Sequence, residues 1–238
     1  MANWGTIKQD ILETIDKPSD GSIVERSLCE TLRFLRTMRF WWNESTFKIY
    51  TTADVGEYDL PNDFLGFIGK VFHKEITVSG STTTEGAKRE LVPRTMDWLE
   101  AYRYTNEEWD ASLAAGRPLF YSLSESKVWL SPIPDSDGDE VSARYLRDLG
   151  TPQEVYSGSA WSVYAPNTET AIATTFSHAW FKEGYDILKH RCCYNLYQDI
   201  YKDTENAQVH LQKFLESMDR VRSETSRRKA ARELRAIW

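Results

Sequence analysis

Apolar positions near the N-terminus repeat with the spacing of a helix. Trp4, Ile7, Ile11 and Ile15 recur every three or four residues, which places them on one face of a helix. Pro18 follows, and proline cannot continue a helix because it lacks the backbone donor. The pattern therefore predicts an amphipathic helix that ends before Pro18.

A second apolar stripe follows the turn at residues 18–21. We expect this helix to run to about residue 42, with apolar positions at Val24, Leu28, Leu35, Met38 and Trp42. Ser22 and Glu25 have the spacing of a capping box, in which each side chain accepts a hydrogen bond from a free backbone donor.

From Thr46 the hydrophobic period shortens to two, as in strands. Alternation on both sides of the turn at residues 54–56 predicts a hairpin of residues 46–49 with 58–60. Further predicted elements are a strand at 71–78, a flexible polar loop at 79–86, a helix at 96–104 capped by Thr95, a hairpin of 119–123 with 127–130, and a strand at 141–146.

The helical period returns in the last third of the chain. One predicted helix carries Phe181, Tyr185, Leu188, Cys192, Leu196 and Ile200, and a second carries Ala207, Leu211, Phe214, Met218 and Val221. Such regular stripes indicate two helices packed in a bundle. After Val221 the stripe lapses, and residues 219–235 hold seven Lys and Arg against three Asp and Glu.

These elements predict an α+β fold in which N- and C-terminal helices form a bundle that carries an inserted small antiparallel β domain. The predicted parts are N-terminal bundle helices at 1–45, the β domain with its short helix at 46–150, a polar connecting segment at 151–176, C-terminal bundle helices at 177–221, and a basic amphipathic tail at 222–238.

Composition narrows the class of protein. The 238 residues are 41% hydrophobic and 27% charged, with a net charge of −7, and no apolar window reaches the roughly 20 residues of a membrane span. The N-terminus predicts no signal peptide. The odd cysteine count without metal-ligand spacing predicts reduced core and near-core thiols at Cys29, Cys192 and Cys193.

Aromatic residues are the compositional outlier. The chain has nine Trp, and large aromatic side chains anchor interfaces as well as cores. We expect an extensive oligomer contact, with candidate anchors at Trp4, Trp41, Trp42 and Trp109.

No recognisable catalytic, cofactor or metal motif is present in the sequence. The histidines His73, His178, His190 and His210 lack metal-ligand spacing, and the common hydrolase, nucleotide and dinucleotide signatures are absent. The carboxylate pairs 107–108 and 137–139 lie in polar, turn-like sequence, where solvated charge is expected. We therefore expect a protein that is not an enzyme and that carries no cofactor.

Two extended runs end at prolines in similar ways, at 57–64 and at 128–134. With the segments 116–121 and 140–145, their order resembles that of the adaptor, or head-to-tail connector, proteins of tailed bacteriophages. The polar segment 151–176 is longer than that pattern. The corner positions of the motifs are Tyr58, Leu60, Pro61, Asp63, Phe64, Leu130, Pro132 and Pro134.

This resemblance implies a structural virion protein in the neck, between capsid and tail, that is assembled in the host cytoplasm. It implies a ring of copies, dodecameric in this family, that contacts the portal protein and a tail or nozzle protein. It also implies that DNA passes through the lumen without specific binding. No membrane contact is expected.

The basic tail carries an apolar strip beside its arginines, formed by Ala230, Leu234, Ile237 and Trp238. Such a strip suits a helix that lies in a protein groove better than one that binds DNA. We predict that the tail docks on the portal through Arg228, Arg232, Leu234, Arg235, Ile237 and Trp238. DNA contact and a frayed end without a role are the alternatives for this segment.

Two other functions remain open for the whole chain. A carbohydrate-binding or cell-wall-degrading tail component would also use aromatic residues and carboxylates. A DNA-binding packaging factor would use the arginines, and its binding would depend steeply on salt.

Overall fold

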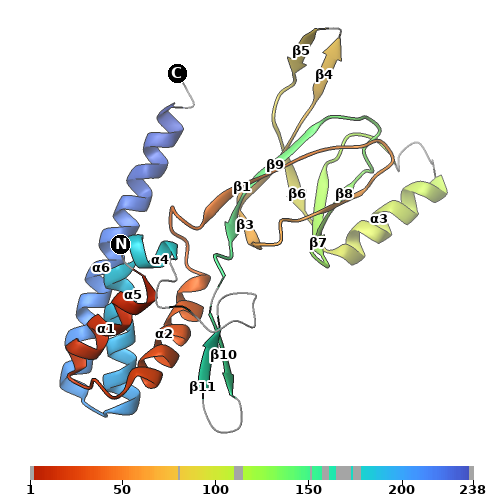
Figure 1. Cartoon of the computed structure of the whole chain (residues 1–238). Helices are drawn as coiled ribbons and strands as arrows, with labels where there is room; N and C mark the ends of the chain where they lie inside the picture. The colour runs from red at the N-terminus through yellow and green to blue at the C-terminus, as the bar shows by residue number, and fades with distance from the viewer. Residues whose placement is uncertain are drawn as a thin grey trace. The chain divides into compact units, whose positions relative to one another are not determined.

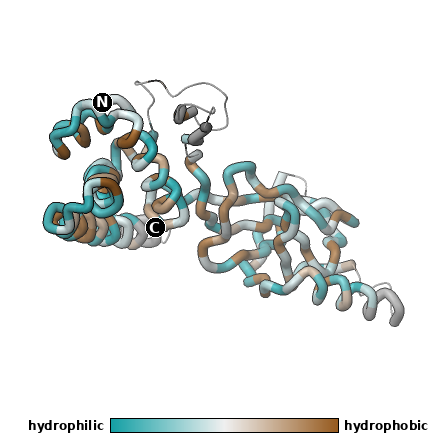
Figure 2. The backbone as a smooth tube through the Cα atoms, turned by 90° about the horizontal axis from the view of Figure 1, so that it is seen from below, coloured by the Kyte–Doolittle hydropathy of each residue, from teal (hydrophilic) through white to brown (hydrophobic). Residues whose placement is uncertain are grey.

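The computed structural model describes residues 3–79, 81–109, 115–150, 152–156, 161–164, 173 and 178–235. They form two compact units (Figure 1): a helical unit, Met1–Asn43 with Asp148–Trp238, and a β unit, Glu44–Arg147. Hydrophobic and hydrophilic stretches alternate along the helices and strands of both (Figure 2). The predicted α+β class is confirmed.

The described residues of the helical unit form five α-helices. They are α1 (Trp4–Ile15), α2 (Gly21–Arg36), α4 (Ala179–Glu183), α5 (Tyr185–Asn195) and α6 (Thr204–Arg235). A π-helical turn, Leu196–Ile200, continues α5, and a short hairpin pairs β10 (Gln153–Tyr156) with β11 (Trp161–Tyr164). Helix α5 contacts α1, α2 and α6, so it lies at the centre of this unit.

The two N-terminal helices follow the predicted stripes but differ at their ends. Asn3 Oδ1 caps α1 by accepting from the Thr6 backbone N–H at 2.8 Å. The predicted capping box of α2 is wrong, because Asp20 is the N-cap residue and makes no side-chain cap bond, while Glu25 pairs with Lys8 at 2.8 Å. The predicted extension to residue 42 is also wrong, since α2 ends at Arg36.

Aromatic packing closes the core of the helical unit. The Phe40 and Trp42 rings stack at 4.8 Å between centroids, and Trp180 meets both edge-on at 5.2 Å. The three cysteines are buried free thiols, as predicted. Other fully buried members of this core include Trp4, Ile7, Ile11, Val24, Leu28, Leu32, Leu35, Phe181, Leu188 and Leu196.

The β unit is built on a seven-stranded sheet with the order β1-β9-β3-β6-β7-β8-β2. Its core includes Phe47, Val71, Leu91, Val128, Leu130, Val141 and Tyr145. The strands are β1 (Glu44–Tyr50), β2 (Glu57–Asp59), β3 (Phe64–Lys74), β6 (Arg89–Pro93), β7 (Phe120–Ser124), β8 (Lys127–Ser131) and β9 (Glu140–Arg147).

The β domain was predicted to be antiparallel, but its sheet also contains one parallel pair of strands. Strands β6 and β7 run parallel, with Val92 opposite Phe120. A parallel pair needs a long crossover connection, and α3 (Met96–Trp109) lies within that connection. The predicted cap of this helix is confirmed, because the Trp98 backbone N–H donates to Thr95 Oγ1 at 3.4 Å.

One predicted pairing and one predicted loop are wrong. Strands β1 and β2 do not form a hairpin with each other, because β1 pairs with β9 and β2 pairs with β8. The predicted loop at 79–86 instead contains β5 (Thr82–Glu85), which pairs with β4 (Ile76–Ser79). The predicted β7–β8 hairpin is confirmed, and Glu125 and Ser126 in its turn have positive φ, as a tight hairpin turn requires.

Candidate docking surfaces

The first motif corner is held by hydrogen bonds on two sides. Leu60 is buried, and the Phe64 backbone N–H donates to Pro61 O at 2.9 Å. The Tyr145 hydroxyl donates to Asp63 Oδ1, also at 2.9 Å. These bonds fix the chain where β2 ends and β3 begins.

The second corner is held in the same manner. The backbone N–H of buried Leu130 donates to Gly56 O at 2.8 Å, and the Asp54 N–H donates to Pro134 O at 2.9 Å. The Ser131–Pro132 peptide bond is cis. The structure thus brings this corner against the loop between β1 and β2.

Tyr58 ties that loop to its own strand. Its hydroxyl donates to Val55 O at 2.8 Å and accepts from the Thr52 backbone N–H at 3.0 Å. All eight corner residues are buried or half-buried. Their contacts in the chain therefore position the backbone of the β unit.

A buried polar cluster lies beside these corners. Asp139 Oδ1 accepts from the Ile76 backbone N–H at 2.9 Å, and Oδ2 accepts from the Ser136 hydroxyl at 3.2 Å. His73 Nε2 lies 3.2 Å from Asp139 Oδ2, and burial lowers the pKa of His73. Because the His73 side chain is only 1% exposed, a substrate could not reach this pair.

The carboxylates at 137–139 were expected to be solvated, and for Asp139 this expectation is wrong. Asp139 is 6% exposed, and its backbone N–H also donates to Thr51 Oγ1 at 3.1 Å. The cluster joins the β3–β4 connection to the turn before β9, so its role is structural.

Removing this carboxylate should destabilise the β unit. We expect Asp139→Ala to lower the free energy of unfolding by about 2–3 kcal/mol, because it leaves buried donors without an acceptor. Urea unfolding followed by circular dichroism would measure this. Asp135→Ala is the matched control, since Asp135 is exposed. Equal unfolding midpoints for the two variants would contradict the structural role.

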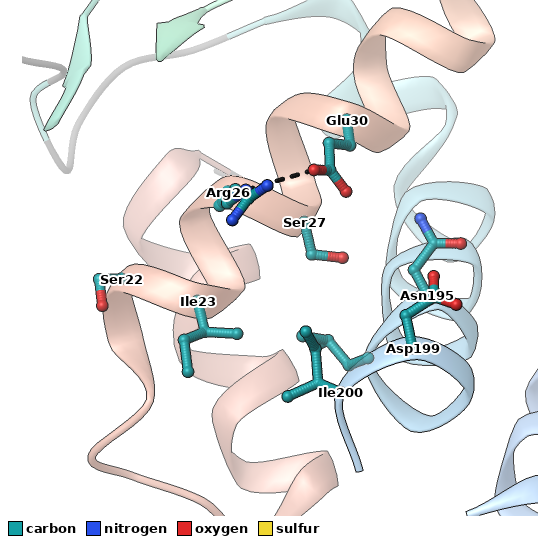
Figure 3. A pocket seen from close by; sticks show the side chains of 9 residues that line it. Ser22, Ile23, Arg26, Ser27, Glu30, Asn195, Asp199 and Ile200 are labelled. Carbon is teal, nitrogen blue, oxygen red and sulfur yellow. Dashed lines mark ion pairs between the residues drawn. The ribbon is translucent and has the colours of Figure 1, made fainter. Parts of the chain in front are cut away.

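An open cavity of about 470 Å³ lies between α2 and the C-terminal end of α5 (Figure 3). Ile23 and Ile200 lie on opposite sides of it. On the α2 side, Arg26 pairs with Glu30 at 3.3 Å. The complete lining is Ser22, Ile23, Arg26, Ser27, Glu30, Asn195, Leu196, Asp199 and Ile200. Three of these nine residues are apolar and six are polar or charged.

The basic segment continues α6 without a break. The helix reaches Arg235, and Thr225 is still buried, so packing against the helical unit extends past the predicted limit at Val221. Arg232 and Leu234 lie in its last turns. The remaining predicted docking residues, Ile237 and Trp238, lie outside the described residues.

Arg228 already has partners in its own chain. Its guanidinium lies 3.6 Å from the centroid of the Trp41 ring and donates to Glu224 Oε1 from Nε at 2.9 Å and from Nη2 at 2.5 Å. Arg228 therefore attaches α6 to the segment after α2.

Two of the four predicted tryptophan anchors are core residues instead. Trp4 is 1% exposed and Trp42 is 5% exposed, so neither can anchor another protein without unfolding. Trp41 is partly buried beneath Arg228. The side chain of Trp109 lies outside the described part of the chain.

A histidine pair between α5 and α6 was not predicted. His190 Nδ1 and His210 Nδ1 are 3.2 Å apart, and the Tyr197 ring stacks on His210. Burial lowers the pKa of both, that of His210 to about 4. The available signal was the position of His210, which precedes Phe214 by four residues on the predicted apolar face.

Charge is divided unequally between the two units. The β unit has 11 Lys and Arg against 18 Asp and Glu, a net charge of −7, whereas the helical unit has 18 of each and a net charge of zero. The net charge of the chain is therefore that of the β unit, and the basic end of α6 belongs to the unit with no net charge.

Comparison with known families identifies the protein class. Residues 2–236 match the family described as SU10 adaptor protein. The chain belongs to this family. The predicted resemblance to phage adaptors is thereby confirmed. No curated protein matched the sequence.

Membership in the SU10 adaptor family assigns a structural role. Phage adaptors are virion components that contact other virion components such as portal and tail, and they are not a class of enzymes. Among the described residues, no three His, Cys, Asp or Glu side chains group as metal ligands. None of the described helices is long and apolar enough to cross a membrane.

Proposed function

We propose that this adaptor forms a ring that joins the portal of the capsid to the tail and encloses part of the DNA conduit. The family match over residues 2–236 carries the proposal. A closed ring requires two complementary surfaces on each copy, related head to tail. The ring, a dodecamer by family resemblance, would lie in the virion neck after assembly in the host cytoplasm.

The charge distribution supports a conduit that does not bind DNA specifically. Like charges repel, so a β unit with a net charge of −7 would not retain a polyanion in transit. In our proposal the β unit faces the tail or nozzle protein and the helical unit faces the portal.

Portal docking is assigned to the end of α6. Its arginines would meet acidic residues of the portal, and its apolar strip would fill a groove there. The residues proposed for this contact are Arg228, Arg232, Leu234, Arg235, Ile237 and Trp238.

Electron microscopy of the portal protein mixed with this adaptor would test the function directly. We expect a ring of adaptor density on the portal, with the helical unit proximal. Wild-type adaptor that fails to bind the portal of its own virus would overturn the proposed function.

Truncation should separate docking from folding. A chain that ends at Lys229 keeps the contact of Arg228 with Trp41 but loses the apolar strip, so we expect at least tenfold weaker portal binding with an unchanged unfolding transition. A chain that ends at Arg235 is the matched variant, because it loses only Ala236, Ile237 and Trp238. Unchanged affinity in both would show that the end of the chain has no docking role.

A further inference from the structure

We propose that a hollow on α6 binds one carboxylate of the portal protein, an inference that rests on the proposed function. This arginine hollow has a volume of about 490 Å³ and is lined by Arg220, Ser223, Glu224, Arg227 and Arg228. It shares Arg228 with the docking segment proposed above and extends that segment toward the N-terminal part of α6.

Helical geometry gathers these residues on one face. The positions i, i+3, i+4, i+7 and i+8 are neighbours on the surface of an α-helix, and α6 is continuous over all of them. Three arginines and Ser223 therefore line the same hollow. Guanidinium groups recognise planar carboxylates through paired hydrogen bonds.

Existing ion pairs leave one positive charge unbalanced. Arg220 Nη2 lies 2.5 Å from Asp186 Oδ2, and Arg228 Nη2 lies 2.5 Å from Glu224 Oε1. The Arg227 side chain is exposed. Three arginines and two carboxylates give this site a local charge of +1, which matches a single carboxylate.

The same carboxylates disfavour DNA as the occupant. DNA presents a closely spaced row of phosphates, and proteins bind it by neutralising several of them with cations. Here Asp186 and Glu224 would repel such a row.

The position of Trp41 favours a protein as the occupant of the hollow. Arg228 lies over its ring at 3.6 Å, so one wall of the hollow continues into a partly buried aromatic surface. Trp and Arg are the side chains enriched at the energetic centres of protein interfaces. Arg228 acts here as a positioning residue, because its contacts with Trp41 and Glu224 set the shape of the hollow.

Charge reversal in the full-length protein tests the site. We expect Arg227→Glu to weaken binding to the portal protein at least tenfold, measured by biolayer interferometry. Arg222→Glu is the matched control: Arg222 is exposed on the same helix but does not line the hollow, so its effect should stay below about threefold. If the wild-type protein binds the portal and the two variants have equal affinities, the proposed carboxylate site in the hollow is wrong, but the adaptor function is not affected.

A photo-crosslinking amino acid in place of Ser223 identifies the occupant. We expect crosslinks to the portal protein that disappear in the presence of Arg227→Glu. Crosslinks only to a second adaptor copy, or to a DNA duplex that the wild-type protein binds and Arg227→Glu does not, would refute the proposed occupant.

Discussion

Trp180→Ala is expected to destabilise the helical unit by about 3–5 kcal/mol, the range for truncating a large buried aromatic residue. Trp180 is 2% exposed, and its ring meets Phe40 and Trp42 edge-on. Truncation therefore leaves a cavity beside the Phe40 and Trp42 rings. These two rings stack on each other, so they cannot move into the cavity without breaking that contact. Urea unfolding followed by circular dichroism would give the change.

Trp98→Ala in the β unit is the matched control. It removes the same atoms, but the Trp98 side chain is 37% exposed, so the vacated space is open to water. We expect less than half the loss seen for Trp180→Ala. Equal losses would show that the aromatic cluster is not the centre of the helical core.

The helical unit should lose stability as the pH falls from about 6.5 to about 4, because the His190–His210 pair must be neutral in the folded protein. The pKa of His210 is lowered from 6.5 to about 4, so in this window the unfolded chain binds more protons than the folded chain. Protonation then favours unfolding. We expect a loss of about 1–2 kcal/mol after allowance for solvent screening.

Neighbouring charges modify this effect, whose direction is set by burial. Lys189 and Lys213 oppose protonation of the pair, whereas Asp10 and Asp186 favour it at His190. Burial is the largest cause for both histidines.

A double variant, His190→Gln with His210→Gln, is the control for the acid effect. Its free energy of unfolding should fall less between pH 6.5 and 4, as measured by urea titration at each pH. Some acid sensitivity should remain, because burial also lowers the pKa of His178. An unchanged pH profile in the double variant would contradict the assignment to this pair.

Local signals in the sequence were sufficient to predict the elements whose hydrogen bonds join residues close together in the chain. The period of α1, the Thr95 cap of α3 and the β7–β8 turn each depend on residues a few positions apart. The order of proline-ended strands was likewise sufficient to predict the adaptor family. The three local elements depend on neighbouring residues, so spacing predicts them, whereas the family was inferred from a resemblance to known adaptor proteins.

Only the tertiary structure decided which strands and side chains from distant parts of the sequence pair with each other. Strand β1 pairs with β9 rather than with β2, because the pairing of this strand depends on which apolar faces meet in the core. The burial of Asp139 depends on Ile76 and Ser136 in the same way.

The proposed docking surface was predictable only in part. The sequence by itself determined that the last helix is basic and carries an apolar strip. Only the tertiary structure decided that Trp4 and Trp42 belong to the core and that Trp41 lies under Arg228. The physical reason is that a side chain's sequence position sets its chemistry, whereas packing against distant segments sets its exposure and its partners.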